Sequence, residues 1–469
     1  MSATARDFAA WSLPASVAVP ERAVLSDLVG DVALRRLAVD ASWVRAICAA
    51  LRASREALRR RPARELAALV GAAGARFLDP TDPIRARALA LLPATAGLSA
   101  EMAAAVLDGM ARDWTAERLG RLLSTEFGNP AALDGFVPGA FALARALGPQ
   151  LCVQIVSGSV PGVGATALVR SLLVKGPTLV KPGRGDVVLP VLLADAVRSA
   201  DPALGDALAV IYWPGGDAEL DSAALLEADV VTAYGGDEAV SLLRASTPVT
   251  SRFVGYHHRF SFGVVGREAL DTAHRHRTAS EVAGAVAFFD QRGCVSPQVV
   301  FVEEGGDASP AEFARELAGA MDVVERHLPG GVLDAGEATR LQHARGTAEL
   351  QAAAGAGVEV HHGGTRAWTV VFDPGPELGP SCVGRLIRVT PVGDVGEVPT
   401  LVSPLGRHLQ TAALAGCGTR RERLASALAD VGVSRIAGFA TAPFPAPWWH
   451  HDGQGPLRAL VRWADLEGE

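Results

Sequence analysis

The stretch Phe288-Phe-Asp-Gln-Arg-Gly-Cys294-Val-Ser-Pro-Gln-Val-Val-Phe-Val302 is where a candidate reactive group meets a predicted element of the core. Its single cysteine follows Gly293 and precedes an apolar run typical of a buried strand. Upstream, Val282–Phe289 is rich in Ala and Val and predicts a short helix. A thiol at such a helix-to-strand turn is expected at a surface or cleft, with the access that a nucleophile needs. Alone, however, a cysteine before a strand is more often a small buried residue.

Length and composition limit the kind of protein this chain can be. Its 469 residues, 49% hydrophobic and 6% aromatic, predict two or three domains or one large two-lobed enzyme. A net charge of −7 with both signs mixed argues against a nucleic-acid surface, and the basic run Arg55–Arg64 is typical of a solvated helix face. No apolar stretch approaches the roughly 20 residues that span a bilayer, and no signal-peptide pattern is present. Five scattered cysteines indicate reduced thiols, so we expect a cytoplasmic protein.

Residues 1–145 predict a mainly helical region that packs on the domain following it. Arg45–Arg61 carries apolar residues on one side and arginines on the other, which is an amphipathic helical pattern. Ser99 can cap a further helix, and Gly128-Asn129-Pro130 is typical of a helix end. These helices carry no chemical signal of their own.

Residues 146–258 alternate between strand-like and helical segments. Leu151–Val156 predicts a strand, and the glycine-rich turn Ser157–Gly164 leads from it into a helix. Further strands are expected at Pro177–Pro182, Ala207–Trp213 and Ala228–Tyr234. This βαβ spacing predicts a parallel sheet with ligands at the carboxyl ends of its strands. The glycine-rich turn matches neither a GxGxxG fingerprint nor a P-loop, so a flexible turn and a ligand loop are equally supported.

Residues 259–435 predict a second α/β domain, which contains Cys294. Helices are expected at Pro310–His327 and Gly336–Ala354, and strands near Val358–His361, Trp368–Phe372 and Leu386–Thr390. Residues 436–469 form a C-terminal segment, rich in Pro and Trp, that closes the active site or packs back on the rest. Its end, Leu457–Trp463, predicts an amphipathic helix.

Together these segments resemble the aldehyde dehydrogenase superfamily, and within it the acyl-CoA reductase family typified by LuxC, the reductase subunit of bacterial bioluminescence systems. The resemblance covers roughly residues 150–460. Its most specific part is the cysteine segment Asp290–Gln298, and the supporting matches are Ser157–Pro161, Thr178–Pro182, His258–Glu268 and His451–Gly453. The resemblance implies an aldehyde-dehydrogenase-like α/β fold, with a Rossmann-type NADP-binding domain, a catalytic domain and a helical N-terminal region.

The resemblance implies covalent thioester chemistry at Cys294. In such enzymes a cysteine thiolate attacks a thioester carbonyl, the carrier thiol leaves, and hydride from a nicotinamide reduces the acyl-enzyme to an aldehyde. Donors must face the oxyanion, and the backbone N–H of Cys294 is one candidate. The superfamily's second donor is an Asn, where this chain has Ser159, whose shorter hydroxyl rotates freely.

A second departure concerns the base that activates water in hydrolytic aldehyde dehydrogenases. Those enzymes carry a Glu in a Glu-Leu-Gly-Gly-Lys segment, whereas the corresponding stretch Phe253–Phe262 has no carboxylate, and the first one to follow is Glu268. Lacking such a base suits an enzyme that must protect its acyl thioester from hydrolysis.

For the cofactor, Lys181 matches the superfamily lysine that contacts the adenosine ribose. Arg184 stands where NAD-preferring relatives tend to have Glu, and an arginine would pair with a 2′-phosphate, so NADPH is expected. An exposed arginine in a turn is the alternative interpretation. Gly235 and Gly236 would let the backbone approach the cofactor, and Ser157 and Pro161 belong to the first ligand loop.

Paired histidines, such as His257-His258 and His450-His451, match no metal-site spacing, and no metal is expected. His258 and His451 are predicted to be polar elements near the active cleft or structural hydrogen-bonding groups.

The expected substrate is a fatty-acyl thioester of CoA or of an acyl carrier protein. An ordinary aldehyde dehydrogenase, a silent scaffold in an acyl-transfer complex and a thioesterase are the alternatives. By resemblance, a dimer or tetramer is expected.

Overall fold

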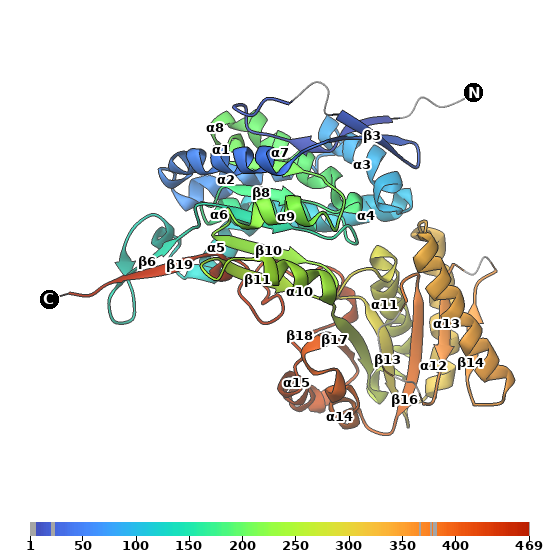
Figure 1. Cartoon of the computed structure of the whole chain (residues 1–469). Helices are drawn as coiled ribbons and strands as arrows, with labels where there is room; N and C mark the ends of the chain where they lie inside the picture. The colour runs from blue at the N-terminus through green and yellow to red at the C-terminus, as the bar shows by residue number, and fades with distance from the viewer. Residues whose placement is uncertain (1–5, 20–23, 365–366, 376–377, 379–381, 469) are drawn as a thin grey trace. The chain divides into compact units, whose positions relative to one another are not determined.

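The computed structural model describes residues 6–19, 24–364, 367–375, 378 and 382–468 (Figure 1). The chain divides into two compact units. The first comprises the chain up to Ala96, Ala103–His257 and the C-terminal segment from Ala446, and the second comprises Gly97–Met102 and His258–Pro445.

The first unit is built on a six-stranded sheet in the order β11-β10-β7-β8-β9-β2. The strands are β2 (Trp11–Ser12), β7 (Cys152–Ile155), β8 (Thr178–Lys181), β9 (Leu208–Ile211), β10 (Val230–Tyr234) and β11 (Arg252–Tyr256). All pair in parallel except β2, which lies antiparallel to β9 at the edge. The predicted βαβ alternation is therefore confirmed, and the strand order reverses between β7 and β10.

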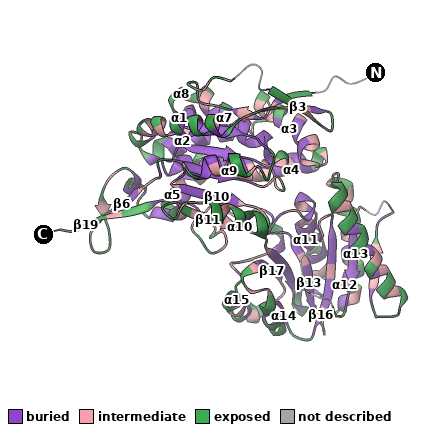
Figure 2. Cartoon of the chain, viewed as in Figure 1, coloured by how far each residue is buried: buried purple, intermediate pink, exposed green. Residues whose placement is uncertain are grey.

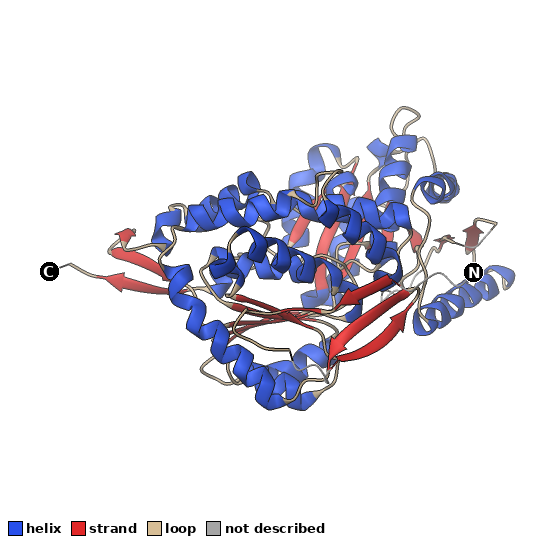
Figure 3. Ribbon diagram, turned by 90° about the horizontal axis from the view of Figure 1, so that it is seen from above, coloured by secondary structure: helices blue, strands red, loops and turns tan. Residues whose placement is uncertain are grey.

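Helices cover both faces of this sheet, which explains why its strands are continuous apolar runs. Every residue of β7, β8 and β9 is buried (Figure 2). Figure 3 shows helices on either side of the strands. α6 (Val163–Leu173) and α7 (Val188–Ala200) cover one face, and α1 (Ala41–Arg59) and α9 (Ala218–Leu225) pack on the other. The short helix α8 (Pro202–Gly205) follows α7, and α10 (Asp237–Ser246) follows β10.

The region before residue 146 contains strands as well as the predicted helices. β1 (Arg6–Ala9), β3 (Val24–Val29) and β4 (Val32–Leu37) form a three-stranded sheet before the helices begin. After α1 come α2 (Ala63–Ala75), α3 (Pro83–Ala96), α4 (Ala100–Ala111) and α5 (Ala116–Phe127). The N–H of Met102 donates to Ser99 Oγ at 3.1 Å, which confirms the predicted cap.

Within the described residues, no single helix has the length and apolar composition of a membrane span, although α3 and α4, bent by 117°, pass that test as a pair.

The prediction of a helix at Leu457–Trp463 is wrong. A short 3-10 turn at Arg458–Leu460 is followed by β19 (Arg462–Leu466), which pairs antiparallel with β6 (Leu143–Leu147). β6 also pairs with β5 (Val137–Pro138). The partner strand lies more than 300 residues earlier in the chain, so the local pattern contained no signal for this pairing.

The second unit contains a seven-stranded sheet in the order β14-β15-β16-β13-β12-β17-β18. The strands are β12 (Phe260–Val265), β13 (Pro297–Glu303), β14 (Glu359–His362), β15 (Thr369–Phe372), β16 (Leu386–Val392), β17 (Leu409–Ala415) and β18 (Arg435–Ala437). Only the edge strand β14 is antiparallel to its neighbour.

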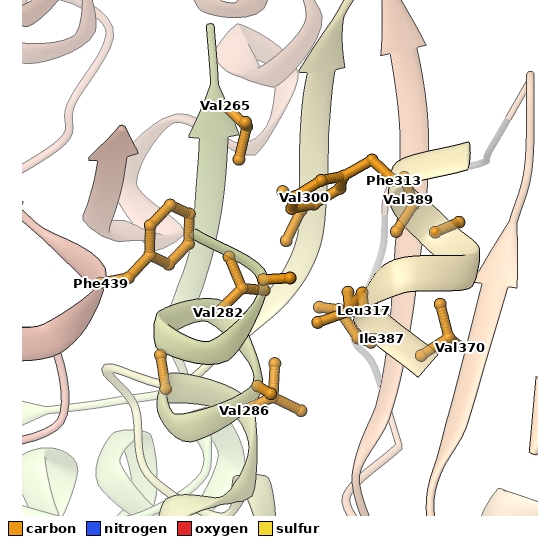
Figure 4. Packing of buried hydrophobic residues seen from close by; sticks show 14 of the residues in the cluster. Val265, Val282, Val286, Val300, Phe313, Leu317, Val370, Ile387, Val389 and Phe439 are labelled. Carbon is orange, nitrogen blue, oxygen red and sulfur yellow. The ribbon is translucent and has the colours of Figure 1, made fainter. Parts of the chain in front are cut away.

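Alternation along β13 fills the cores on both faces of this sheet. Val300 and Val302 pack with α11 (Arg275–Ala287) and α12 (Pro310–His327), as Figure 4 shows for Val300. Val299 and Phe301 point to the opposite face, against α14 (Val398–Val402) and α15 (Arg421–Asp430). α13 (Ala335–Ala353) follows α12 and packs beside β14.

A buried carboxylate anchors the glycine-rich turn between β7 and α6. The two oxygens of Asp186 accept the N–H groups of Gly162 and Gly164, each at 2.6 Å. Gly162 has a φ of 99°, a conformation that glycine adopts without a steric penalty. Burial raises the pKa of Asp186 to about 8, while the two N–H groups act in the opposite direction.

This carboxylate makes stability depend on pH. The folded protein keeps Asp186 protonated up to about pH 8, whereas the unfolded chain releases the proton near its ordinary value of about 3.9. The unfolded state then binds fewer protons, so this group lowers the free energy of unfolding as pH rises from about 4 to about 8, by up to about 1.4 kcal/mol per pH unit. Urea unfolding of Asp186→Asn at several pH values should show a flatter dependence than wild type. Equal slopes for the two proteins would contradict the assignment.

Candidate functional site

Cys294 lies in a turn between α11 and β13 and is exposed, as predicted for an accessible thiol. α11 begins earlier than expected and ends at Ala287. The other cysteines are Cys382, which is half-buried, and Cys48, Cys152 and Cys417, which are buried. Burial raises the pKa of Cys48 and Cys152 to about 12 and that of Cys417 to about 11. Cys294 is therefore the cysteine best placed to react.

The backbone before Cys294 is held in an uncommon conformation. Phe289, Asp290 and Gln291 have φ values of 57°, 49° and 64°, in the left-handed region that residues with a side chain rarely occupy. Each such residue costs about 1–3 kcal/mol, so surrounding contacts must hold the turn in place.

The side chain of Gln291 provides part of that support. It is buried, and its Nε2 donates to the carbonyls of Pro297 at 2.9 Å and Leu386 at 2.7 Å. Its Oε1 accepts the N–H of Leu386 at 2.9 Å. One amide thus joins the turn to the first residues of β13 and β16.

Two arginines compensate the buried charge of Asp290. Arg385 donates from Nε to Asp290 Oδ1 at 2.9 Å and from Nη1 to Glu325 at 2.7 Å. Arg292 Nη1 lies 3.6 Å from Asp290 Oδ2. The same guanidinium forms a bidentate ion pair with the Glu337 carboxylate, with hydrogen bonds of 2.9 and 2.8 Å. Buried charges that are paired in this way resist rearrangement, because removing one partner leaves the other uncompensated.

Cys294 itself is tied to the sheet through its backbone. Ser261, the second residue of β12, donates from Oγ to the carbonyl of Cys294 at 2.6 Å. Beyond the cysteine, the backbone N–H of Ser296 donates to the carbonyl of Gly293 at 3.0 Å. The thiol-bearing residue is therefore exposed on a rigid backbone.

In the first unit, two predicted cofactor segments meet where the strand order reverses. Ser157–Pro161 follows β7, and Gly235 and Gly236 follow β10, the adjacent parallel strand. Ligands of such sheets bind in the crevice at this switch point. Ser159 and Gly236 are exposed, Ser157 is half-buried and Pro161 is buried.

The turn that carries Arg184 lies directly against the first of these loops. A Cβ on Gly185 would lie 2.2 Å from the carbonyl oxygen of Gly158, and one on Gly183 would lie 2.3 Å from the Gly158 nitrogen. Glycines at these positions let two backbones touch. The exposed Arg184 is consequently held beside the loop Ser157–Pro161.

Lys181 and Arg184 differ in their surroundings. Lys181 ends β8 and is buried, with its ammonium 6.0 Å from the centre of the Trp213 ring. Burial lowers the pKa of Lys181, and the nearby charge of Asp221 opposes this shift. No carboxylate of the described residues forms an ion pair with Arg184, which leaves its charge available to an anion.

Carboxylates occupy the helix starts at this crevice. Asp186 accepts the first N–H groups of α6, and Asp237 and Glu238 lie in the first turn of α10. Anions usually bind at free helix N-termini. In this chain, the positive charges that could hold a phosphate are therefore the side chains of Lys181 and Arg184.

Four aromatic rings stack beside the same sheet edge. Tyr234 and Tyr256, the last residues of β10 and β11, have ring centres 4.5 Å apart. His451 stacks on Tyr256 at 4.1 Å, and Trp449 stacks on His451 at 4.6 Å. The ring of His451 is therefore stacked between the rings of Tyr256, at the end of β11, and Trp449.

The other histidine singled out by sequence is His258. Its backbone carbonyl accepts a hydrogen bond from the ring of His408 at 3.3 Å.

Sequence reasoning did not identify several of these residues. Asp290 and Gln291 lie inside the quoted cysteine segment, but Ser261, Arg385 and Asp186 gave no local signal. Glu268, the first carboxylate after the segment that lacks the water-activating Glu, accepts two hydrogen bonds from Arg420 at 3.0 and 2.9 Å. Its carboxylate is thereby engaged as an ion-pair partner.

Known proteins are similar to this chain in sequence and in fold. The long-chain acyl-protein thioester reductase of Aliivibrio fischeri is 27% identical over 350 residues, covering 74% of this chain and 70% of the relative. Aldehyde dehydrogenase 21 from Physcomitrella patens, solved with succinate, has a TM-score of 0.80 at 11% identity and covers 99% of this chain and 98% of its own. The NADP-dependent glyceraldehyde-3-phosphate dehydrogenase from Bacillus halodurans C-125, solved with NADP, has a TM-score of 0.70 at 16% identity, covering 95% of both.

These structural similarities confirm the aldehyde-dehydrogenase-like α/β fold. The acyl-CoA reductase (LuxC) family matches residues 65–463, which include the cysteine turn and all the predicted cofactor segments. The chain belongs to the acyl-CoA reductase (LuxC) family.

Proposed function

We propose that this protein reduces the fatty-acyl group of a thioester to an aldehyde, using NADPH and a covalent acyl-Cys294 intermediate. The observation that carries this proposal is an exposed thiol on a braced turn, in a chain of the acyl-CoA reductase family. The relative from Aliivibrio fischeri is a long-chain acyl-protein thioester reductase, which favours a long acyl chain.

In the proposed reaction, the Cys294 thiolate attacks the thioester carbonyl and the carrier thiol leaves, so that the acyl group becomes bound to the enzyme. A thiolate suits both halves of the reaction because it is a good nucleophile and a good leaving group. The N–H of Cys294 donates to the developing oxyanion, and Ser159 is the proposed second donor. NADPH, when bound, supplies the hydride that reduces the acyl group. The Cys294 thiolate then departs as the aldehyde forms.

Two features favour this reaction over oxidation of an aldehyde to an acid. The segment Phe253–Phe262 contains no carboxylate that could activate water. Glu268, the next one along the chain, is paired with Arg420. Without a general base for water, the acyl thioester persists long enough to be reduced.

NADPH is proposed because Arg184 is exposed beside the Ser157–Pro161 loop and has no carboxylate partner among the described residues. A 2′-phosphate would supply the missing anion, and Lys181 would contact the ribose. Gly235 and Gly236 leave space for a close approach, since a Cβ on Gly236 would meet nothing within 4 Å. The similar glyceraldehyde-3-phosphate dehydrogenase was solved with NADP.

The carrier is the least specified part of the substrate. The family name points to CoA, while the relative acts on an acyl-protein. We therefore propose to measure NADPH consumption with purified protein, offering long-chain acyl-CoA and an acylated carrier protein in parallel and trapping the aldehyde. Aldehyde formed from either thioester supports the function. Acid formation from an aldehyde with NADP⁺ as the oxidant, or no reaction with any thioester, contradicts it.

Replacing the proposed nucleophile gives the most direct prediction. Cys294→Ala should reduce aldehyde formation by at least about 10³-fold, since the substitution removes the thiol on which the proposed acyl-enzyme forms. Nucleotide affinity should change less than about twofold, because the predicted cofactor residues lie on other elements. Activity is measured by aldehyde release, and the acyl-enzyme by mass spectrometry of the intact protein.

Cys382→Ala is the matched control, because Cys382 is the other cysteine that is not buried. It should retain the acyl-enzyme and turn over at close to the wild-type rate. Full activity in Cys294→Ala, or loss of the acyl-enzyme only in Cys382→Ala, would remove Cys294 from the mechanism.

A charge reversal at Arg184 tests the cofactor proposal. Arg184→Glu should lower the ratio of kcat/KM for NADPH over NADH by about tenfold or more, because a carboxylate repels the 2′-phosphate and accepts from ribose hydroxyls. Arg64→Glu, which makes the same charge change on an exposed arginine of α2, should leave the ratio unaltered. An unchanged ratio in Arg184→Glu would exclude a role in cofactor choice.

A further inference from the structure

A cavity lies at the amino edge of the six-stranded sheet in the first unit. Its volume is about 500 Å³, which is within the range of small-molecule sites. Its walls come from α1, the loop before β7, the residues that directly precede β10 and β11, and the start of β19. Arg55, Arg252 and Arg462 all line this cavity, and we call it the arginine pocket.

The three arginines reach the pocket from different elements. Arg55, on α1, donates from Nη2 to the carbonyl of Gly148 at 3.1 Å. Arg252, the first residue of β11, donates from Nη1 to the carbonyl of Ala459 at 3.1 Å. Arg462, the first residue of β19, is exposed, and its side chain forms no hydrogen bond with the described residues. The acceptors are neutral carbonyls, which orient a guanidinium without compensating its charge.

The charge of the pocket is unbalanced. Asp229 is the only carboxylate among the described residues that line it, and its Oδ2 accepts the N–H groups of Gln150 at 2.7 Å and Leu151 at 3.0 Å. None of the three arginines forms an ion pair with a carboxylate of the described residues. Burial lowers the pKa of Arg55, and the charge of Arg462 acts in the same direction, whereas Asp229 opposes the shift. The four charged groups together leave two positive charges.

This charge and this lining match a phosphate monoester. Such a group carries a charge of about −1.5 to −2 at neutral pH, and its oxygens suit the planar fork of a guanidinium. A carboxylate would balance only one of the two charges. Pro149, Val230 and Leu460 are buried side chains that also line the pocket, and they would contact the organic part of the molecule.

The pocket is separate from the candidate cofactor crevice. Val230, which lines the pocket, begins β10, and Tyr234 ends that strand directly before Gly235. At about 3.3 Å per residue, the strand holds the two sites about 13 Å apart. A ligand in the pocket therefore does not occupy the place proposed for the 2′-phosphate beside Arg184.

We propose that the arginine pocket binds a phosphorylated small molecule, whose phosphate group is held by Arg55, Arg252 and Arg462. The bound phosphate would be shared by α1, β11 and β19, so it would tie the C-terminal strand to the sheet. This inference does not rest on the proposed reaction, and neither the sequence motifs nor the resemblance indicated the site.

The test is isothermal titration calorimetry of the full chain with inorganic phosphate and with phenyl phosphate. Ionic strength is held constant, because exposed charges are screened by salt. The chain carries Arg184→Glu, which removes the other candidate phosphate site. Phenyl phosphate should bind once per chain, at least as tightly as inorganic phosphate, because its ring adds apolar contact. No saturable binding of phenyl phosphate below about 10 mM overturns the proposal. Binding of inorganic phosphate alone overturns it too, as an adventitious ion only.

Arg462→Gln in the same background removes one of the three charges from a side chain that makes no hydrogen bond within the described residues. It should weaken the binding of phenyl phosphate by about tenfold or more, because a hydrogen bond to a charged group is lost. Arg64→Gln, at an exposed arginine of α2 in the same unit, is the matched control and should leave the affinity unchanged.

Circular dichroism checks that each variant is folded. Unchanged affinity in folded Arg462→Gln, or an equal loss in Arg64→Gln, overturns the proposal. If Arg462→Gln does not fold, Arg252→Gln takes its place, with the same tenfold loss expected and the same outcome overturning the site. Neither result bears on aldehyde formation, so the binding site and the proposed reductase function stand or fall separately.

Discussion

The left-handed backbone of Phe289, Asp290 and Gln291 is the constraint on which the cysteine turn depends. Three such residues in succession cost several kcal/mol by the usual estimate of about 1–3 each, and the turn persists because side-chain contacts outweigh that cost. The amide of Gln291 makes three hydrogen bonds to strand ends, and the carboxylate of Asp290 is paired with Arg385. An exposed thiol is thereby presented on backbone that cannot relax toward a more common geometry.

Each unit places its chemistry at one edge of a mostly parallel sheet, but the edges differ. In the first unit the candidate cofactor loops follow the carboxyl ends of β7 and β10, where the strand order reverses. In the second unit Cys294 precedes the amino end of β13, beside the starts of β12 and β16. The amino edge suits the cysteine because the strand starts supply free backbone groups, which Gln291 and Ser261 use to fix the turn.

The arginines of this chain differ in whether a carboxylate compensates their charge. Arg292 and Arg385 have carboxylate partners and brace the cysteine turn. Arg184 is exposed without such a partner among the residues described. An uncompensated cation that is held in place interacts with an incoming or developing anion more strongly than a paired one. The sequence singled out Arg184 by its position, whereas the partners of Arg292 and Arg385 are apparent only in the tertiary structure.

The sequence by itself determined the alternation of strands and helices in residues 146–258, the Ser99 cap and the exposed turn at Cys294, because periodicity, caps and turns depend on neighbours a few residues apart. It also indicated the family, through the segment Asp290–Gln298. Only the tertiary structure decided that Leu457–Trp463 is no helix and that Gln291 binds Leu386. The physical reason is that those contacts join residues about 95 to more than 300 positions apart. Strand pairing and buried hydrogen bonds across such distances leave no trace in local sequence patterns.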